Sequence, residues 1–197
     1  MSKKRNVFQL TIISMLLAIL IAQTFIPMLG YIPLGPIDVT IVHITVILAA
    51  VLFGTKTGAV IGASWGILSM IRAYIQPTPF NVVFLNPLIS VLPRLIVGLV
   101  SAWCFSLLSD RISNKWSYAV TAGIGTLTNT VLVLGGIYLF ASETYAQALG
   151  ISESLLLGAL GTVVATNGVI EIIASVIILP LVAIPLSKAL KRRNASL

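Results

Sequence analysis

The sequence predicts an all-α membrane protein with six transmembrane helices, and two observations support that prediction. The chain has 197 residues, of which 58% are hydrophobic and only 9% are charged. A soluble domain carries roughly 25% charged residues, so too few charges remain here to cover a water-facing surface. The apolar residues also gather into long runs, and a membrane-spanning helix needs about 20 of them. This composition argues against both a soluble enzyme and a disordered chain.

Six apolar segments can be drawn within what we interpret as one domain, 1–197. They cover residues 8–28, 37–54, 57–75, 84–109, 117–140 and 160–187. The first run shows no small-residue cleavage site after a short core, so we interpret it as a retained helix rather than a signal peptide. Gly and Pro interrupt the chain at 29–36 and prolines recur in 76–87, so neither segment continues a helix. Residues 141–159 carry two glutamates and are interpreted as a loop or a short surface helix.

The basic residues orient these segments. With the N-terminus inside, ten of the 12 Lys and Arg residues fall in cytoplasmic pieces: Lys3, Lys4, Arg5, Lys56, Arg111, Lys115, Lys188, Lys191, Arg192 and Arg193. The outer loops hold none. Because positive charge collects on the cytoplasmic side, both termini are predicted to be cytoplasmic. The net charge of +7 is spread over loops that flank apolar spans, which argues against a nucleic-acid-binding face.

Two basic residues, Arg72 and Arg94, fall within predicted spans. Arg94 lies about 15 Å into the fourth span at helical rise, where a charge costs at least about 2.5–3.5 kcal/mol and is usually buried against a partner. Glu171 has a similar depth, so Arg94 either forms a structural ion pair with Glu171 or binds an anionic solute, and the two roles are compatible. The fork of an arginine suits a carboxylate. Pro93 would free a backbone carbonyl beside Arg94.

Polar amides surround this depth and predict a pocket that opens outward for a polar organic solute. The candidates are Asn129 and Thr126 in the fifth span, Asn167 one turn before Glu171 in the sixth, and Asn81 and Asn86 near the third loop. Each amide taken alone is equally well explained as a hydrogen bond between helices. Together they offer donors and acceptors from several spans at one depth.

The remaining candidates have plain structural alternatives. Trp65 lies halfway along the third span and either packs in the core or forms an apolar wall of the pocket. His43 bonds a neighbouring helix or lines the site. Asp38 caps the second span or binds Arg72. Aromatic residues near the outer boundary, Tyr31, Tyr74 and Phe80, are interpreted as interfacial anchors.

Enzyme motifs are weak or missing. Residues 62–66 match GxSxG, but they lie in an apolar helix rather than at a strand-to-helix turn. Gly54, Gly58, Gly62 and Gly66 recur every four residues instead, which predicts a smooth stripe for close helix packing. The chain lacks a Walker A motif, and one Cys with one His gives no zinc cluster. Energy for any pumping would have to come from another chain.

Taken together, these features of the sequence resemble a known protein family. Six spans, the run Ala18-Ile-Leu-Ile-Ala22, and the stretch 38–53 followed by GTKTGAVIGASWGILSM look like the substrate-binding S component of an energy-coupling factor (ECF) vitamin transporter. The resemblance implies a subunit of the bacterial cell membrane without catalysis or a cofactor of its own. It implies partners, a transmembrane T component and two ATPases, and contact of Ala18 and Ala22 with the T component.

Within the family, the chain looks most similar to pantothenate S components. Pantothenate carries one carboxylate, an amide and two hydroxyls. Arg94 would hold the carboxylate, Asn129, Asn167 and Asn86 would bond the polar groups, and Trp65 would pack the aliphatic part. Folate and riboflavin are alternative vitamins, and Arg72 with Arg94 keeps folate open. A stand-alone secondary carrier and an intramembrane enzyme are the rival classes.

Overall fold

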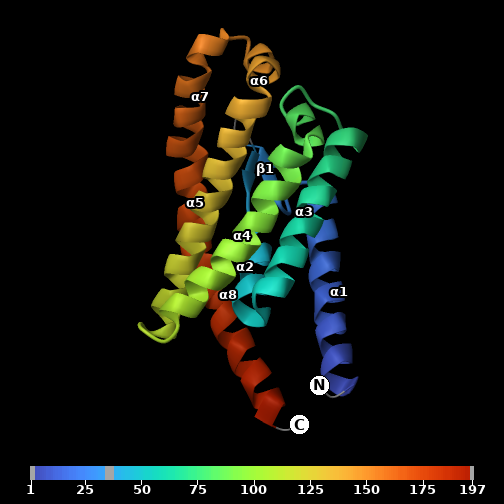
Figure 1. The fold of residues 1–197 in the computed structure, drawn as a ribbon, viewed down its shortest axis with the longest axis vertical. Coiled ribbons are helices and arrows are strands. Elements are labelled where there is room, and N and C mark those ends of the chain that lie inside the picture. The colour runs from blue at the N-terminus through green and yellow to red at the C-terminus, as the bar shows by residue number, and fades with distance from the viewer. Residues whose placement is uncertain (1–2, 34–37, 196–197) are drawn as a thin grey trace.

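The structure, a computed structural model, describes residues 3–33 and 38–195, and helices make up most of it (Figure 1). Its longer helices are α1 (Lys3–Phe25), α2 (Val42–Phe53), α3 (Thr55–Ile75), α4 (Pro87–Leu108), α5 (Asn114–Phe140) and α8 (Val169–Ala195). Its shorter helices are α6 (Ser142–Leu149), α7 (Leu156–Val163), the 3-10 helices η1 (Val82–Leu85) and η2 (Glu153–Leu155), and the π-helix η3 (Val164–Gly168). Strands β1 (Tyr31–Pro33) and β2 (Asp38–Thr40) form an antiparallel pair.

Apolar helices dominate the bundle. In the described part of the chain, four helical segments are long and apolar enough to cross a membrane: Thr55–Ile75, Pro87–Leu108, Asn114–Phe140 and Glu153–Arg192. Two further apolar helices, Leu10–Phe25 and Val42–Phe53, are shorter. The last long segment joins η2, α7, η3 and α8 without a break. The chain is therefore an all-α membrane protein that carries one small hairpin.

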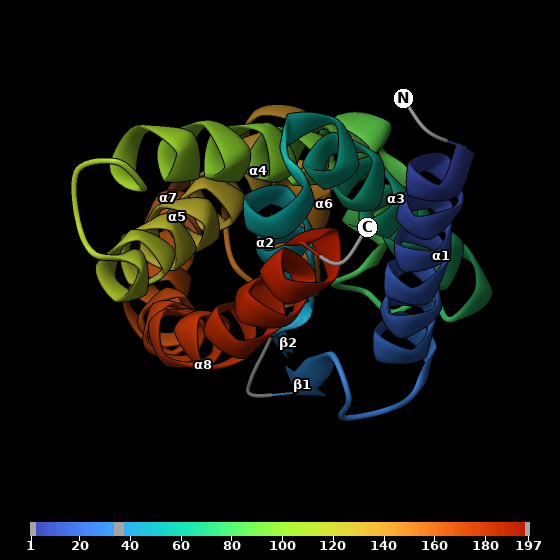
Figure 2. The same ribbon diagram turned by 90° about the horizontal axis from the view of Figure 1, so that it is seen from below.

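The second predicted segment, 37–54, differs from the structure at its start. Residues 38–40 pair with β1, with Tyr31 opposite Thr40, so their backbone groups are used in a strand and the helix begins only at Val42. The resulting α2 is surrounded by α3, α4, α5 and α8 (Figure 2). A helix enclosed on all sides must be apolar around its whole circumference. The sequence of α2, VHITVILAAVLF, meets this condition with little exception.

Glycines bring α3 and α4 into close contact, as the glycine stripe predicts. A Cβ added at Gly58 would lie 2.8 Å from the carbonyl oxygen of Gly98, and one added at Gly66 would lie 2.5 Å from the Cα of Val91. One added at Gly62 would overlap the carbonyl oxygen of Arg94. Gly54 has a different role: nothing lies near its missing Cβ, and its φ of 84° forms the one-residue turn between α2 and α3.

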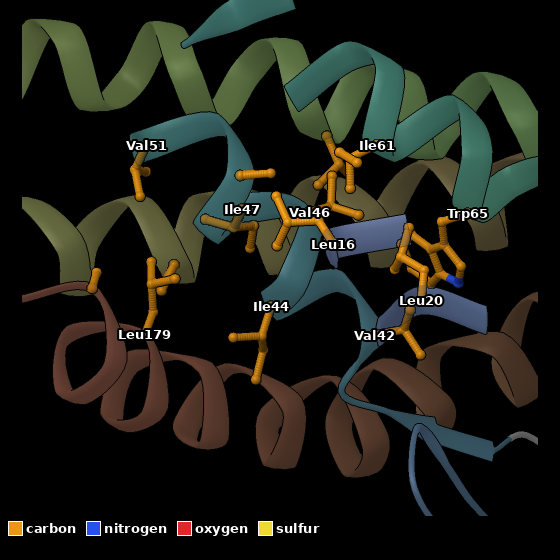
Figure 3. Close-up of a cluster of buried hydrophobic side chains, with 14 of the residues drawn as sticks. Leu16, Leu20, Val42, Ile44, Val46, Ile47, Val51, Ile61, Trp65 and Leu179 are labelled. Carbon is orange, nitrogen blue, oxygen red and sulfur yellow. The ribbon is translucent and has the colours of Figure 1, made fainter. Parts of the chain in front are cut away.

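Two clusters of buried apolar side chains lie along the bundle. The larger one gathers around α2 and includes Leu20, Ile47, Ile61, Trp65 and Leu179 (Figure 3). The smaller one joins η1 and the start of α4 to the end of α5, α6 and α7: Val83, Ile89, Val133, Leu134, Ile137, Tyr145, Leu156 and Leu160. The free ends of α1 and α8 lie together at one end of the bundle, and α6 lies at the other (Figure 1).

Candidate functional site

A cavity of about 270 Å³ opens in the half of the bundle that carries the hairpin, η1 and α6. Its walls come from most of the elements in that half: Tyr31, Asp38, Thr40, Ser69, Arg72, Ala73, Thr78, Phe80, Asn81, Phe84, Arg94, Asn129, Thr130, Val133, Leu134, Ile137, Tyr145, Val163, Asn167, Gly168 and Glu171. Six of the predicted site residues are in this set: Arg72, Asn81, Arg94, Asn129, Asn167 and Glu171. Concave sites with a few convergent polar groups are typical of small-molecule binding.

Arg94 is held in the cavity wall by the backbone of its own helix. Pro93 has no N–H, so the carbonyl of Ile89, four residues earlier, loses its intrahelical partner. The Nη1 of Arg94 donates to that carbonyl oxygen. The guanidinium carbon also lies 4.9 Å from the ring centroid of Trp65 and 5.0 Å from that of Phe84, within the range of cation–π attraction. The side chain is 96% buried and its Nε–H has no hydrogen-bond partner among the described residues.

Glu171 does not form the ion pair with Arg94 that the sequence suggested as an alternative. Its Oε1 accepts a hydrogen bond from the backbone N–H of Thr40 at 2.7 Å, which ties α8 to β2. Within residues 3–33 and 38–195, the structure gives one ion pair, between Arg72 and Asp38 at 3.2 Å. Arg94 thus forms no ion pair with the described residues.

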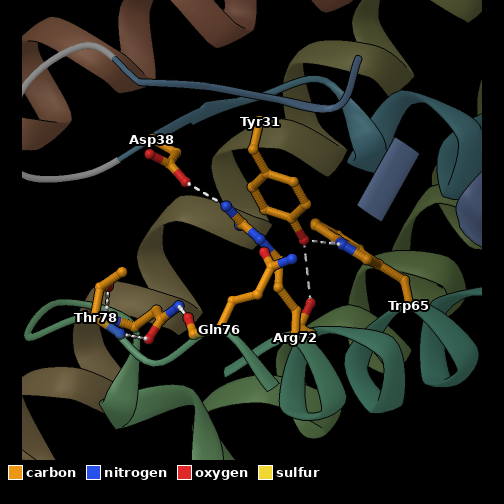
Figure 4. Close-up of polar contacts among 8 residues, drawn as sticks. Tyr31, Asp38, Trp65, Arg72, Gln76 and Thr78 are labelled. Carbon is orange, nitrogen blue, oxygen red and sulfur yellow. Dashed lines mark hydrogen bonds and ion pairs between the residues drawn. The ribbon is translucent and has the colours of Figure 1, made fainter. Parts of the chain in front are cut away.

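The mouth of the cavity is organised by Tyr31 (Figure 4). Its hydroxyl accepts a hydrogen bond from the indole Nε1 of Trp65 at 2.8 Å and lies 3.2 Å from the hydroxyl of Ser69. The Arg72 guanidinium lies over its ring at 4.1 Å and pairs with Asp38. The predicted Arg72–Asp38 contact is confirmed. Tyr31, expected to be an interfacial anchor, is instead part of the cavity wall.

The predicted asparagine side chains differ in how freely their amide groups face the cavity. Asn129 on α5 is 95% buried, and its Oδ1 accepts no hydrogen bond from the described residues. Asn167 enters the wall from the π-helix, a wide helical turn that is often found at functional sites. Asn81 is used in its own turn: its Oδ1 accepts from the Thr78 N–H at 2.7 Å, and its Nδ2 donates to the Gln76 carbonyl at 2.8 Å.

Four predicted site residues lie outside the described cavity lining: Asn86, Thr126, His43 and Trp65. Asn86 caps α4, since its Oδ1 accepts from the Leu88 N–H at 3.0 Å, directly before the proline that begins the helix. Thr126 bonds Ser175 at 2.8 Å. His43 is fully buried in α2. Trp65 acts one step away from the cavity, through Arg94 and Tyr31.

Sequence reasoning did not single out twelve of the wall residues, among them Thr40, Ser69, Phe84, Thr130 and Tyr145. Ser69 follows Trp65 by one helical turn, so its face could have been inferred. Tyr145 lies in a segment interpreted only as a loop or surface helix. Groups of three or more His, Cys, Asp or Glu that could hold a metal ion do not occur in the part of the chain that the structure covers.

Known proteins are similar to this sequence over most of its length. The sequence profile of the family described as "ECF transporter, substrate-specific component" matches residues 8–183. The pantothenate transporter PanT of Leuconostoc mesenteroides subsp. mesenteroides is 34% identical over 185 residues, which cover 86% of this chain and 87% of the relative. The pantothenic acid transporter PanT of Lactococcus lactis subsp. cremoris is 31% identical over 202 aligned positions, with 95% and 97% covered.

The extent of these matches and the apolar helices both indicate a membrane transport protein. Both bacterial relatives are transporters by name, and each is covered nearly from end to end. The apolar helices make the chain a multi-pass protein of the bacterial plasma membrane. The profile match covers the hairpin, the cavity walls and most of every long helix. The chain therefore belongs to the family of substrate-specific components of ECF transporters.

Proposed function

We propose that this chain binds pantothenate from outside the cell and delivers it for uptake driven by ATP hydrolysis on partner subunits. The observation that carries the proposal is Arg94, a buried cation in the cavity wall whose carboxylate neighbour, Glu171, is bonded elsewhere. Relatives at 34% and 31% identity are named as pantothenate transporters, which supports the choice of vitamin.

The cavity chemistry suits each part of pantothenate. Arg94 would receive the carboxylate through its guanidinium. Asn129 and Asn167 would exchange hydrogen bonds with the amide and a hydroxyl, and Val133 would contact the aliphatic skeleton. A volume of about 270 Å³ is just below the range of about 300–1,000 Å³ typical of drug-sized ligands. This size favours a compact solute over riboflavin or folate, which carry large fused rings.

We further propose six membrane crossings with both termini in the cytoplasm. The short helices Leu10–Phe25 and Val42–Phe53 would supply the two crossings beyond the four long segments. Lys115 and Lys191 belong to the end of the bundle that carries the free ends of α1 and α8, as the positive-inside rule requires of a cytoplasmic face. The side chains of Lys3, Lys4, Arg5 and Arg193 lie outside the described residues.

The partners in this proposal are a transmembrane T component and two ATPases. Ala18 is exposed and Ala22 half-buried on α1, a helix that also exposes Met15, Ile19 and Ile21. Small residues on an uncovered helix face allow another helix to approach closely. This surface supports α1 as the docking helix for the T component.

Equilibrium binding of pantothenate, folate and riboflavin to the purified chain tests the proposed substrate. Pantothenate should bind most tightly. Arg94→Gln should weaken pantothenate binding by about 10–100-fold, because hydrogen bonds to charged groups contribute about 1.5–3 kcal/mol. Arg111→Gln, which changes an exposed arginine in the turn after α4, is the matched control and should leave affinity unchanged. Equal affinity of the Arg94→Gln variant and the wild type would contradict the carboxylate role.

Docking of the partner is tested separately from binding. The double variant Ala18→Leu with Ala22→Leu should keep its affinity for pantothenate and lose ATP-dependent uptake when reconstituted with a T component and ATPases. Leucine side chains would hold the partner helix away from α1. Normal uptake by this variant would remove the docking assignment, and uptake by the wild-type chain without any ATPase would favour a stand-alone carrier.

A further inference from the structure

Tyr145 has a buried hydroxyl without a hydrogen-bond partner in the described part of the chain. It belongs to α6, the short helix between α5 and α7, and only 1% of the residue is exposed. Its ring packs edge-on against Phe80, with centroids 6.1 Å apart and planes at 63°. Tyr145 also belongs to the smaller core cluster, which includes Val133 and Ile137.

The hydroxyl makes no hydrogen bond to the described residues that would stabilise the empty protein. A buried polar group left unpaired loses its hydration without compensation, whereas a phenylalanine of the same shape would fill the space without that cost. Burial, together with the nearby Asp38 carboxylate, raises the pKa of Tyr145, so the hydroxyl keeps its proton and remains a donor at physiological pH. The group is thus a donor and acceptor that the folded chain itself leaves unused.

Tyr145 is one of the residues that line the cavity. Tyr145 lines it together with Val133 and Ile137, so an apolar wall and one unused hydroxyl occur side by side. Asp38 lines the same cavity and its charge acts on Tyr145, so a ligand carboxylate is favoured at Arg94 rather than here. The ligand group that suits Tyr145 is therefore a neutral hydroxyl attached to a branched aliphatic carbon.

We propose that Tyr145 is a specificity-determining residue that hydrogen-bonds the terminal hydroxyl of the ligand. In pantothenate this hydroxyl follows a carbon that carries two methyl groups, which would rest on Val133 and Ile137. The inference depends on the proposed function and deepens it. It makes α6 the part of the binding site that contacts the end of the vitamin farthest from the carboxylate.

A four-way binding comparison tests this pairing. Wild type and Tyr145→Phe are each measured with pantothenate and with its analogue that lacks the terminal hydroxyl. Tyr145→Phe should weaken binding of pantothenate by about 3–10-fold and leave binding of the analogue unchanged, since one hydrogen bond is lost. Such non-additivity is the signature of a direct contact. Tyr74→Phe, which alters a tyrosine that is 79% exposed, is the matched control and should change neither affinity.

Thermal unfolding of the ligand-free proteins separates binding from a structural role. Tyr145→Phe should unfold at the same temperature as wild type or a higher one, because the unpaired hydroxyl is removed. A lower unfolding temperature, an unchanged affinity for pantothenate, or an equal loss for both ligands would overturn the assignment of Tyr145. These results leave the proposed function standing if wild type binds pantothenate, whereas no binding by wild type would remove both.

Discussion

At the scale of single residues, Arg94 shows how a charge is accommodated inside an apolar bundle. Placing it at the membrane centre costs at least about 2.5–3.5 kcal/mol. The freed carbonyl of Ile89 and the rings of Trp65 and Phe84 offset part of that cost. The Nε–H has no partner among the described residues, which leaves a residual penalty. The proline before Arg94 is therefore a part of the site.

Replacing this proline gives a residue-scale prediction. Pro93→Ala restores an N–H that can bond the Ile89 carbonyl within the helix, so it competes with Arg94 for that oxygen. Pantothenate affinity should fall by about 3–10-fold, the effect of one weakened hydrogen bond. The unfolding temperature of the empty protein should hold or rise. Both are measured on purified protein, and an unchanged affinity would show that the proline does not position Arg94.

Some residues of the site could be predicted from the sequence and others could not. A charge in an apolar run is conspicuous wherever it occurs, so Arg94 and Glu171 were identifiable without a structure. Trp65 and Tyr31 are 34 residues apart, and nothing local in the sequence indicates that the indole N–H of one meets the hydroxyl of the other. Buried aromatic residues look alike in a sequence whether they pack, bond or line a cavity.

At the scale of elements, the contact between α3 and α4 positions the binding site. Gly62 lies directly against the backbone carbonyl of Arg94, so the separation of the two helices fixes where the guanidinium sits. The periodicity of the glycines predicts this contact. The hairpin was not predictable in the same way, because its pairing depends on residues 31–33 and 38–40 and on Glu171 from the far end of the chain.

A methyl group at this contact tests its importance. Gly62→Ala should lower stability by about 1–3 kcal/mol through overpacking and weaken pantothenate binding, because α4 must move. Gly135→Ala adds the same methyl to the interior of α5 where nothing lies nearby, and should stabilise the helix by roughly 0.5–1 kcal/mol. Thermal unfolding and binding of both variants make the comparison. Equal behaviour of the two variants would contradict the packing argument.

At the scale of the whole molecule, the distribution of basic residues matches the two ends of the helical bundle. The sequence assigns the basic residues to one side of the membrane, and in the fold Lys115 and Lys191 belong to the end where α1 starts and α8 finishes. The cavity belongs to the opposite half. Positive charge in the loops determines how the helices insert into the membrane, so the orientation of the chain can be predicted from sequence alone. The shape of the cavity depends on how seven separate segments converge, so it cannot be predicted in this way.

The orientation of the chain in the membrane can be tested by cysteine labelling. The sole cysteine, Cys104, is 94% buried and is first replaced by alanine. In that background, Thr144→Cys on α6 should react with a membrane-impermeant maleimide in intact cells, whereas Lys191→Cys should react only after permeabilisation. Both positions are exposed in the fold, so differences in labelling report the side of the membrane. Labelling of Lys191→Cys in intact cells would reverse the proposed topology.

The π-helix at Val164–Gly168 has a consequence for how binding sites in this bundle could diversify. An extra residue in one turn advances everything beyond it by about 100° around the helix axis. Deleting Ala165 would return the turn to ordinary spacing and rotate Asn167 and Glu171 together relative to α7. A change in length by one residue would thus exchange the side chains that meet the ligand without substituting any of them. Insertion and deletion, as well as substitution, are therefore routes to a new preference at this wall.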